Sequence, residues 1–283
     1  MSCAMMFLLL ASGCGNSDTV KIADVRAARD AESLSLVGRD IGTSELQKIA
    51  TLTNLKTLNL EHTGVKDLSA LSTLKELEEL DLSRNTITDL TPLENLTKLK
   101  SLVFQASDTD LSVLSALTEL ESLSIKGKVK DLSPLADLPH LNTVGLTNPD
   151  ADLAPLSANG NLKSLYLHYD GTVPYSGISA FTQLESLTLE TNGMDDLSPF
   201  SDLTNLRSLS IWDDTEDLSP LYGLTNLEEL TIRGDNTDVS CLSVLTNLKK
   251  LTITGWVPDI QSTYLLQESL PDLVIDLPGT EGV

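Results

Sequence analysis

The chain has 283 residues, of which 41% are hydrophobic and 21% charged, which argues against wholesale disorder. The 41 Asp and Glu outnumber the 19 Lys and Arg, and the resulting net charge of −22 argues against general binding to nucleic acid or to an anionic membrane surface. Aromatic residues make up only 4%, so the core is expected to be aliphatic, and three Cys cannot build a disulfide-stapled fold.

The N-terminal segment has the features of a secretory signal. Residues 5–11 (MMFLLLA) are too few to span a bilayer as a helix, but they fit the apolar part of a signal peptide. Residues 10–14 (LASGC) resemble the bacterial lipobox, in which small residues precede a Cys that becomes the lipidated first residue of the mature protein. This resemblance implies a signal peptide over 1–13, acylation of Cys14, and a lipid anchor in the outer leaflet of a bacterial cell membrane. The alternative is a short apolar segment that is buried in the fold.

A repeated pattern, L-x-x-L-x-L, covers most of the remaining chain. It recurs every 21 or 22 residues from Leu55 to Leu248, after a degenerate copy at Ala31, and gives about 11 units. Leucines two positions apart, such as Leu58 and Leu60, point to the same face of a strand. Because one unit cannot bury enough apolar surface by itself, neighbouring units must stack and join their strands in a parallel ladder. Residues 14–30 are expected to hold the lipidated Cys, a spacer and an N-terminal cap formed by a short strand or a helical turn.

A second block, D-L-S-P-L, lies half a period after each strand. Its clearest copy is residues 131–135, where Ser133 precedes Pro134. Ser or Thr just before Pro is typical of a helix N-cap with Pro at the first helical position, so each block predicts a short helical turn, often 3₁₀. Strands on the inside and short helices outside curve the array. A β-solenoid without helices is the rival architecture.

Together these motifs resemble the leucine-rich repeat family, over about residues 31–277. The period is most similar to the short class found in bacterial internalins and in a regulatory subunit of a eukaryotic protein phosphatase. The resemblance implies an α/β repeat solenoid, a curved array with a parallel β-sheet on the concave face and short helical turns on the convex face. We expect the array to close with a helix and a strand over 259–277, followed by a tail at 278–283. The internalin resemblance implies adhesion or partner recognition.

The sequence contains little catalytic chemistry. Its three His are at least 28 residues apart, and it has no HExxH, CxxC, GxSxG or P-loop pattern. The Asp clusters of the loops lack a spacing that would supply six oxygen ligands to Ca²⁺, so we interpret them as solvated loops. We therefore expect no catalytic residues, no metal site and no cofactor.

Large side chains stand out on the predicted concave face. Most solvent-facing strand positions carry Ser or Thr, and Tyr166 is an exception. His168 and Tyr169 follow the strand of Tyr166, and the position of His168 is taken in the next three units by Glu190, Trp212 and Arg233. Trp, Tyr and Arg dominate binding hot spots, which makes this row the candidate ligand-binding surface. The alternative is that Trp212 and Tyr169 fold over the array and cover it.

These features predict a non-enzymatic module on the bacterial cell surface, anchored to the membrane at Cys14, that captures a protein or peptide ligand on its concave face. The alternative is a cytoplasmic scaffold or regulatory subunit of an enzyme, resembling the phosphatase regulator. Lipidation of Cys14 separates the two. The sequence does not name the ligand.

Overall fold

A computed structural model describes residues 18–170, 175–191, 196–214, 217–233, 237–255 and 259–277. The chain divides into two compact units, residues 1–141 and 142–283, and each is described by itself. The signal segment, Cys14 and the C-terminal tail lie outside the described residues.

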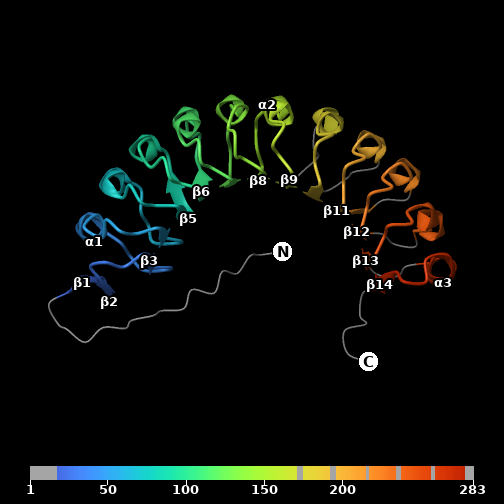
Figure 1. The fold of residues 1–283 in the computed structure, drawn as a ribbon, viewed down its shortest axis with the longest axis horizontal. Coiled ribbons are helices and arrows are strands. Elements are labelled where there is room, and N and C mark those ends of the chain that lie inside the picture. Colours follow the sequence, from blue (N-terminus) through green and yellow to red (C-terminus); the bar gives the residue numbers. More distant parts are fainter. Residues whose placement is uncertain are drawn as a thin grey trace. The chain divides into compact units, whose positions relative to one another are not determined.

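The first unit opens with a hairpin and continues as strands that alternate with short helices (Figure 1). The antiparallel hairpin consists of β1 (Thr19–Ile22) and β2 (Val25–Ala28). The strands that follow are β3 (Ser33–Ser35), β4 (Thr57–Asn59), β5 (Glu79–Ile87), β6 (Ser101–Ala106) and β7 (Ser122–Lys126). The helices between and after them are α1 (Thr43–Ile49) and the 3₁₀ turns η1 (Ser69–Thr73), η2 (Thr91–Leu93), η3 (Ser112–Ala116) and η4 (Ser133–Leu135).

The second unit repeats this alternation. Its strands are β8 (Thr143–Thr147), β9 (Ser164–His168), β10 (Ser186–Glu190), β11 (Ser208–Asp214), β12 (Glu229–Arg233), β13 (Lys250–Thr254) and β14 (Val274–Asp276). Its helices are α2 (Ala154–Ala158), η5 (Tyr175–Ala180), η6 (Ser198–Phe200), η7 (Ser219–Leu221), η8 (Ser240–Val244) and α3 (Ile260–Ser269). The helix and strand expected over 259–277 are thus α3 and β14.

Apart from the N-terminal hairpin, the strands within each unit pair in parallel and in chain order, and up to β13 the first buried aliphatic residue of one strand falls in register with that of the next. In the first unit Leu58 pairs with Leu80, and Leu80 with Leu102. In the second, Leu165 pairs with Leu187, and Leu187 with Leu209. In each unit the strands lie on the inner side of an arc and the helices on the outer side (Figure 1). The predicted curved solenoid is confirmed, and the helix-free rival is wrong.

The core is a column of aliphatic side chains between strands and helices. Strand residues alternate between buried and half-buried, as in β9, where Leu165 and Leu167 are at most 1% exposed. Each helical turn adds one more side chain, for example Leu221 of η7 at 0%. Since each repeat buries its leucines against the neighbouring repeats, the fold is stabilised by the stacking of repeats and not by any single one.

The D-L-S-P-L turns differ from the prediction in one respect. Ser133 is not a side-chain N-cap. Its backbone N–H instead donates to Oδ1 of Asp131 at 2.8 Å, and Pro134 occupies an early helical position. The same Asp-to-N–H bond recurs in eight other repeats, at Asp67, Asp89, Asp110, Asp152, Asp196, Asp217, Asp238 and Asp259. The aspartate two residues before the N–H is thus the local acceptor, because its short side chain reaches the backbone two positions on.

The C-terminal helix α3 has an unusual distribution of side chains. It buries Ser262, Thr263 and Leu266, whereas Ile260 and Tyr264 are 55% and 66% exposed. None of the helices in the described part of the chain is long and apolar enough to cross a lipid bilayer.

Candidate functional site

The strand face of the second unit is a sheet surface covered mainly by small hydroxyl side chains. The half-buried positions of β9 to β13 carry Ser164, Ser186, Thr188, Ser208, Ser210, Thr231 and Thr252. Parallel pairing sets Ser164 beside Ser186, and Ser186 beside Ser208. Neighbouring strands lie about 4.8 Å apart, so the hydroxyls form regular rows that a ligand can approach closely.

Larger side chains lie at one end of these rows and form hydrogen bonds with one another. The hydroxyl of Tyr166 donates to Oε2 of Glu190 at 2.7 Å, and Nδ1 of His168 lies 3.0 Å from the same oxygen. Nε2 of His168 lies 3.1 Å from Oδ1 of Asp170. Asn148 completes the group, since its Nδ2 donates to Oδ2 of Asp170 at 2.5 Å and its Oδ1 accepts the backbone N–H of Asp170 at 2.8 Å. We call these five residues the polar cluster.

The polar cluster has a defined electrostatic state at two of its members. Burial, followed by the hydrogen bond to Glu190, raises the pKa of the Tyr166 phenol, which therefore stays protonated and donates. Hydrogen bonds from Asn148 and His168 lower the pKa of Asp170, which favours its ionised form. The cluster thus presents an anionic carboxylate at Asp170, whose side chain is 77% exposed.

The cluster does not have the geometry of a metal site. Both ring nitrogens of His168 face carboxylate oxygens, so the imidazole separates the two carboxylates instead of converging with them on one point. Among the described residues, no group of three His, Cys, Asp or Glu side chains is arranged to hold a metal ion.

The predicted row is only partly continuous. Glu190 pairs with His168 across β9 and β10, as the repeat spacing predicts. Trp212 is 44% exposed on β11. The register shifts after Ile211, however, and Arg233 lies opposite Asp214 instead of Trp212. The prediction that Trp212 and Arg233 lie side by side is therefore wrong.

Tyr169 does not belong to the exposed row. Its side chain is only 9% exposed, because the alternation of the strand continues past His168 and turns the next residue inward. Tyr169 is therefore part of the core of the repeat array. The lipidation site predicted at Cys14 lies outside the described residues.

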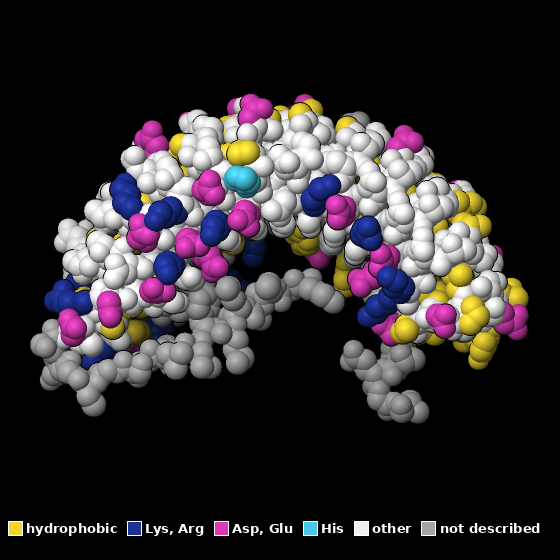
Figure 2. Space-filling model, viewed as in Figure 1, with side chains coloured by type: hydrophobic (Ala, Val, Ile, Leu, Met, Phe, Trp, Pro, Cys, Tyr) yellow, Lys and Arg dark blue, Asp and Glu magenta, His cyan; other side chains and the backbone are white. Residues whose placement is uncertain are grey.

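Sequence reasoning missed a row of alternating charges along the rim of each unit. The second position of L-x-x-L-x-L alternates between basic and acidic residues except at Asn142, and neighbouring repeats form ion pairs there. These are Lys56–Glu32 at 3.0 Å, Lys100–Glu78 at 2.7 Å, Lys163–Glu185 at 3.2 Å and Arg207–Glu228 at 2.9 Å, with Lys249 also pairing with Glu228. Figure 2 shows basic and acidic side chains interspersed along the visible face. The signal was present in the sequence as the alternation of Lys or Arg with Glu at this position.

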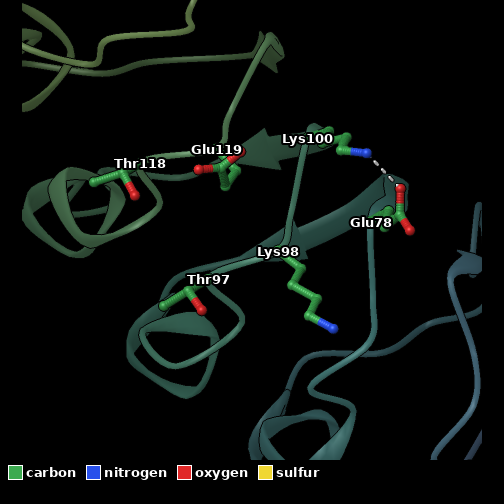
Figure 3. A pocket seen from close by; sticks show the side chains of 6 residues that line it. All are labelled: Glu78, Thr97, Lys98, Lys100, Thr118 and Glu119. Carbon is green, nitrogen blue, oxygen red and sulfur yellow. Dashed lines mark hydrogen bonds and ion pairs between the residues drawn. The ribbon is translucent and has the colours of Figure 1, made fainter.

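The rim of the first unit contains a shallow hollow of about 430 Å³. Figure 3 shows the side chains that line it: Glu78, Thr97, Lys98, Lys100, Thr118 and Glu119. Lys100 pairs with Glu78, and Lys98 pairs with Glu76 at 2.6 Å. Both ammonium groups of the hollow are thus engaged within the chain, and the hollow follows from the spacing of the rim ion pairs.

Comparison with known proteins agrees with this geometry. The family model for leucine-rich repeats (two copies) matches residues 53–95 and 75–116. No curated protein sequence matches the chain significantly. Among solved structures, an internalin (inlF) from Listeria monocytogenes is 29% identical with a TM-score of 0.67, covering 90% of this chain and 76% of that chain.

Two further structures resemble the chain. An internalin C2 (inlC2) from Listeria monocytogenes is 30% identical with a TM-score of 0.45, covering 76% of this chain and 84% of that one. The plant peptide hormone receptor RGFR1, in complex with RGF2, is 17% identical with a TM-score of 0.54, covering 89% of this chain and 48% of the receptor. An identity this low shows the shared fold alone.

The stacked strands, the leucine column and these matches place the chain in the leucine-rich repeat family. Within that family it is internalin-like. The fold is typical of protein-binding modules, and proteins of this kind are generally not enzymes.

Proposed function

We propose that the protein is a non-enzymatic module of the bacterial cell surface that captures a protein or peptide ligand on the strand face of its second unit. Tyr166, His168, Glu190, Trp212 and Arg233 are the residues proposed to contact the ligand.

The observation that carries the proposal is the exposure of Trp212. This side chain is 44% exposed on a strand that also carries the half-buried Ser208 and Ser210. An indole left in water costs free energy, and burying it against a partner regains that energy. Trp is also among the residues most often found at the energetic centre of protein interfaces. Trp212 is therefore the proposed anchor of the interface.

The surroundings of Trp212 favour binding without a large entropic cost. Tyr166 and His168 are held by hydrogen bonds to Glu190, and the neighbouring strands are part of a continuous parallel ladder within the unit. Side chains that are already fixed lose little rotamer freedom when a ligand binds. A rigid floor of hydroxyls with a few larger groups at its edge suits an extended or loop-like segment of a partner protein.

The proposed attachment to the membrane is a lipid on Cys14, as the lipobox-like sequence at residues 10–14 implies. The alternative is a cytoplasmic scaffold with the same repeats. Metabolic labelling with a radioactive lipid precursor distinguishes the two: we expect label in the wild-type chain and none in Cys14→Ser. Equal labelling of both variants, or none in either, would contradict the lipid anchor.

Ligand capture is tested with two matched aromatic substitutions. Trp212 lies on the strand face, and Tyr222, which is 39% exposed, lies at the end of η7 on the helical side. We expect Trp212→Ala to lose proteins that co-purify with the wild-type chain, and Tyr222→Ala to retain them, with thermal unfolding unchanged in both. Retention of the same proteins by Trp212→Ala would remove the strand face as the binding surface.

A further inference from the structure

The two units differ in their number of basic residues. Residues 1–141 contain 14 Lys and Arg against 20 Asp and Glu, a net charge of −6, whereas residues 142–283 contain 5 against 21, a net charge of −16. The two units have almost the same number of acidic residues, so the difference in net charge comes from the smaller number of Lys and Arg in the second unit. A need for solubility does not by itself account for the difference in net charge between the units. A negative net charge spread evenly over both units would keep the protein equally soluble.

The few cations of the second unit are also engaged within the chain. Lys163, Arg207 and Lys249 form the rim ion pairs, and Lys250 pairs with Asp276 at 2.9 Å. Residues 164–232 contain twelve Asp and Glu and only one Lys or Arg, Arg207. This part of the molecule therefore has an excess of carboxylates over cations.

The contrast is clearest where strands end. In the first unit, Glu61 at the end of its strand pairs with Arg84 at 3.5 Å, and Asp108 pairs with Lys130 at 2.9 Å. In the second unit, the ion pairs of Glu190 and Asp170 among the described residues are both with the ring of His168. Glu190 and Asp170 thus have one imidazole between them, whereas Glu61 and Asp108 each have a Lys or Arg of their own.

Trp212 adds a second feature that suits a cation. Glu190 ends β10 and Trp212 follows Ile211 on the adjacent β11, where Leu189 and Ile211 are the last paired residues. Glu190 and Trp212 thus occupy equivalent positions on neighbouring strands, each directly after the last paired residue. An aromatic face attracts an ammonium or guanidinium group, and a carboxylate can bind the same group by charge-assisted hydrogen bonds.

We infer that the strand face of the second unit binds a cationic segment of a partner protein, one in which Lys or Arg side chains project at intervals from an extended chain. A guanidinium or ammonium of this segment packs on Trp212 and pairs with Glu190 or Asp170, and its backbone lies over the Ser and Thr floor. The inference rests on the proposed function, since it specifies the partner chemistry of the same surface.

The test uses the full chain and three fluorescein-labelled peptides of equal length that alternate Ser with Arg, with Gln or with Glu. Fluorescence anisotropy measures their affinity for the wild-type chain and for variants. We expect the Arg peptide to bind best and to weaken with added salt, because screening reduces attraction between exposed charges. Trp212→Ala, Glu190→Gln and Asp170→Asn are each expected to weaken it by about threefold or more, the loss expected for one exposed cation–π or ionic contact.

Matched controls carry the same charge change in the first unit. Glu61→Gln occupies the strand-end position equivalent to Glu190, and Asp108→Asn follows its strand as Asp170 does. We expect both to leave the affinity of the Arg peptide within about twofold of wild type, since their carboxylates already have cations. Thermal unfolding followed by circular dichroism verifies that each variant is folded. Trp212→Ala, at a residue outside the polar cluster, serves as the second variant in case Glu190→Gln disturbs that cluster.

The outcomes separate the inference from the proposed function. If Trp212→Ala weakens the Gln or Glu peptide and the Arg peptide does not bind, the surface captures ligands but the cationic partner is wrong. If the controls weaken the Arg peptide as much as Glu190→Gln does, the attraction is general to the chain and the inference is overturned. If no variant of the second unit alters binding of any peptide, both the inference and the proposed function are contradicted.

Discussion

Asn85 offers a sharp test of how the repeats hold together. Its side chain is 2% exposed and lies after the buried strand leucine Leu82. Nδ2 donates to the backbone oxygens of Leu60 at 2.7 Å, Leu82 at 3.1 Å and Ser83 at 3.2 Å, while Oδ1 accepts the backbone N–H of Thr63 at 3.0 Å. One amide thus joins the backbones of two successive repeats inside the core.

The substitution Asn85→Ala removes these bonds unequally. The carbonyl of Leu60 keeps a bond from the hydroxyl of Thr63 at 2.7 Å, and that of Ser83 keeps the N–H of His62 at 2.9 Å. The N–H of Thr63, in a residue that is 1% exposed, loses its amide acceptor. An unsatisfied buried donor costs about 1–3 kcal/mol, and lost hydrogen bonds add about 1 kcal/mol. We expect Asn85→Ala to lower the free energy of unfolding by about 3 kcal/mol.

Urea unfolding followed by circular dichroism measures this change, with Asn205→Ala as the control. Asn205 is exposed and makes one bond, from Nδ2 to the backbone oxygen of Thr182 at 2.8 Å, so its loss is expected to cost about 0.5 kcal/mol. Hydrogen exchange at Thr63 should accelerate in Asn85→Ala, because its N–H loses a buried acceptor. A free energy of unfolding that changes equally in the two variants would refute the role assigned to Asn85.

Three further predictions concern stability. Acidification should destabilise the fold. The backbone N–H and hydroxyl of Ser133 lower the pKa of Asp131 in the folded state. The stability that these bonds contribute is therefore fully present above the unfolded Asp pKa of about 3.9, and it is lost as the pH falls through the lower pKa of the folded state. Urea midpoints measured from pH 7 to pH 3 should fall at the acid end, and less so in Asp131→Asn; a midpoint independent of pH would contradict this. His62 has φ +54, a conformation that favours glycine, so His62→Gly should raise the free energy of unfolding by about 0.5 kcal/mol, and a decrease would argue against strain at this turn. On α3, Leu266→Ala should lower the free energy of unfolding by about 2–5 kcal/mol, because Leu266 is 0% exposed. Tyr264→Ser should lower it by less than about 0.5 kcal/mol, because Tyr264 is 66% exposed. Similar losses in the two variants would show that the helix packs with its other face.

Much of the fold follows from the sequence because one pattern is repeated many times. Each copy of L-x-x-L-x-L specifies which face of a strand is buried, and successive copies fix the register of their neighbours, as at Leu165 and Leu187. The capping of the short helices was less predictable. Ser133 and Asp131 are both common at helix starts, and only the local backbone geometry decides that the acceptor is Asp131.

The candidate site was harder to predict because it lies where the repeats become irregular. The spacing placed His168 beside Glu190 correctly, since both lie within regular strands. It failed at Arg233, where a local shift of register follows Ile211 and changes the residue opposite. This two-residue shift changes the neighbours of Arg233 without changing the leucine pattern, so the sequence carries no signal for it.

The bonds within the polar cluster illustrate a second limit. Asn148 lies 22 residues from Asp170, one repeat apart, and its bond to Asp170 depends on side-chain directions beyond the end of the strand. Asn148 itself has φ +51, which the residue tolerates better than most others. Repeat spacing brings the two residues into neighbouring units, but the side-chain contact requires the turn geometry.

Site-specific photo-crosslinking tests the central claim most directly. A photoreactive amino acid is placed at position 212 on the strand face or at position 222 on the helical side, and intact cells that produce the full chain are irradiated. We expect discrete crosslinked adducts from position 212 and none of the same size from position 222. Adducts from position 222 alone, or identical adducts from both positions, would contradict the claim that the strand face of the second unit is the ligand-binding surface.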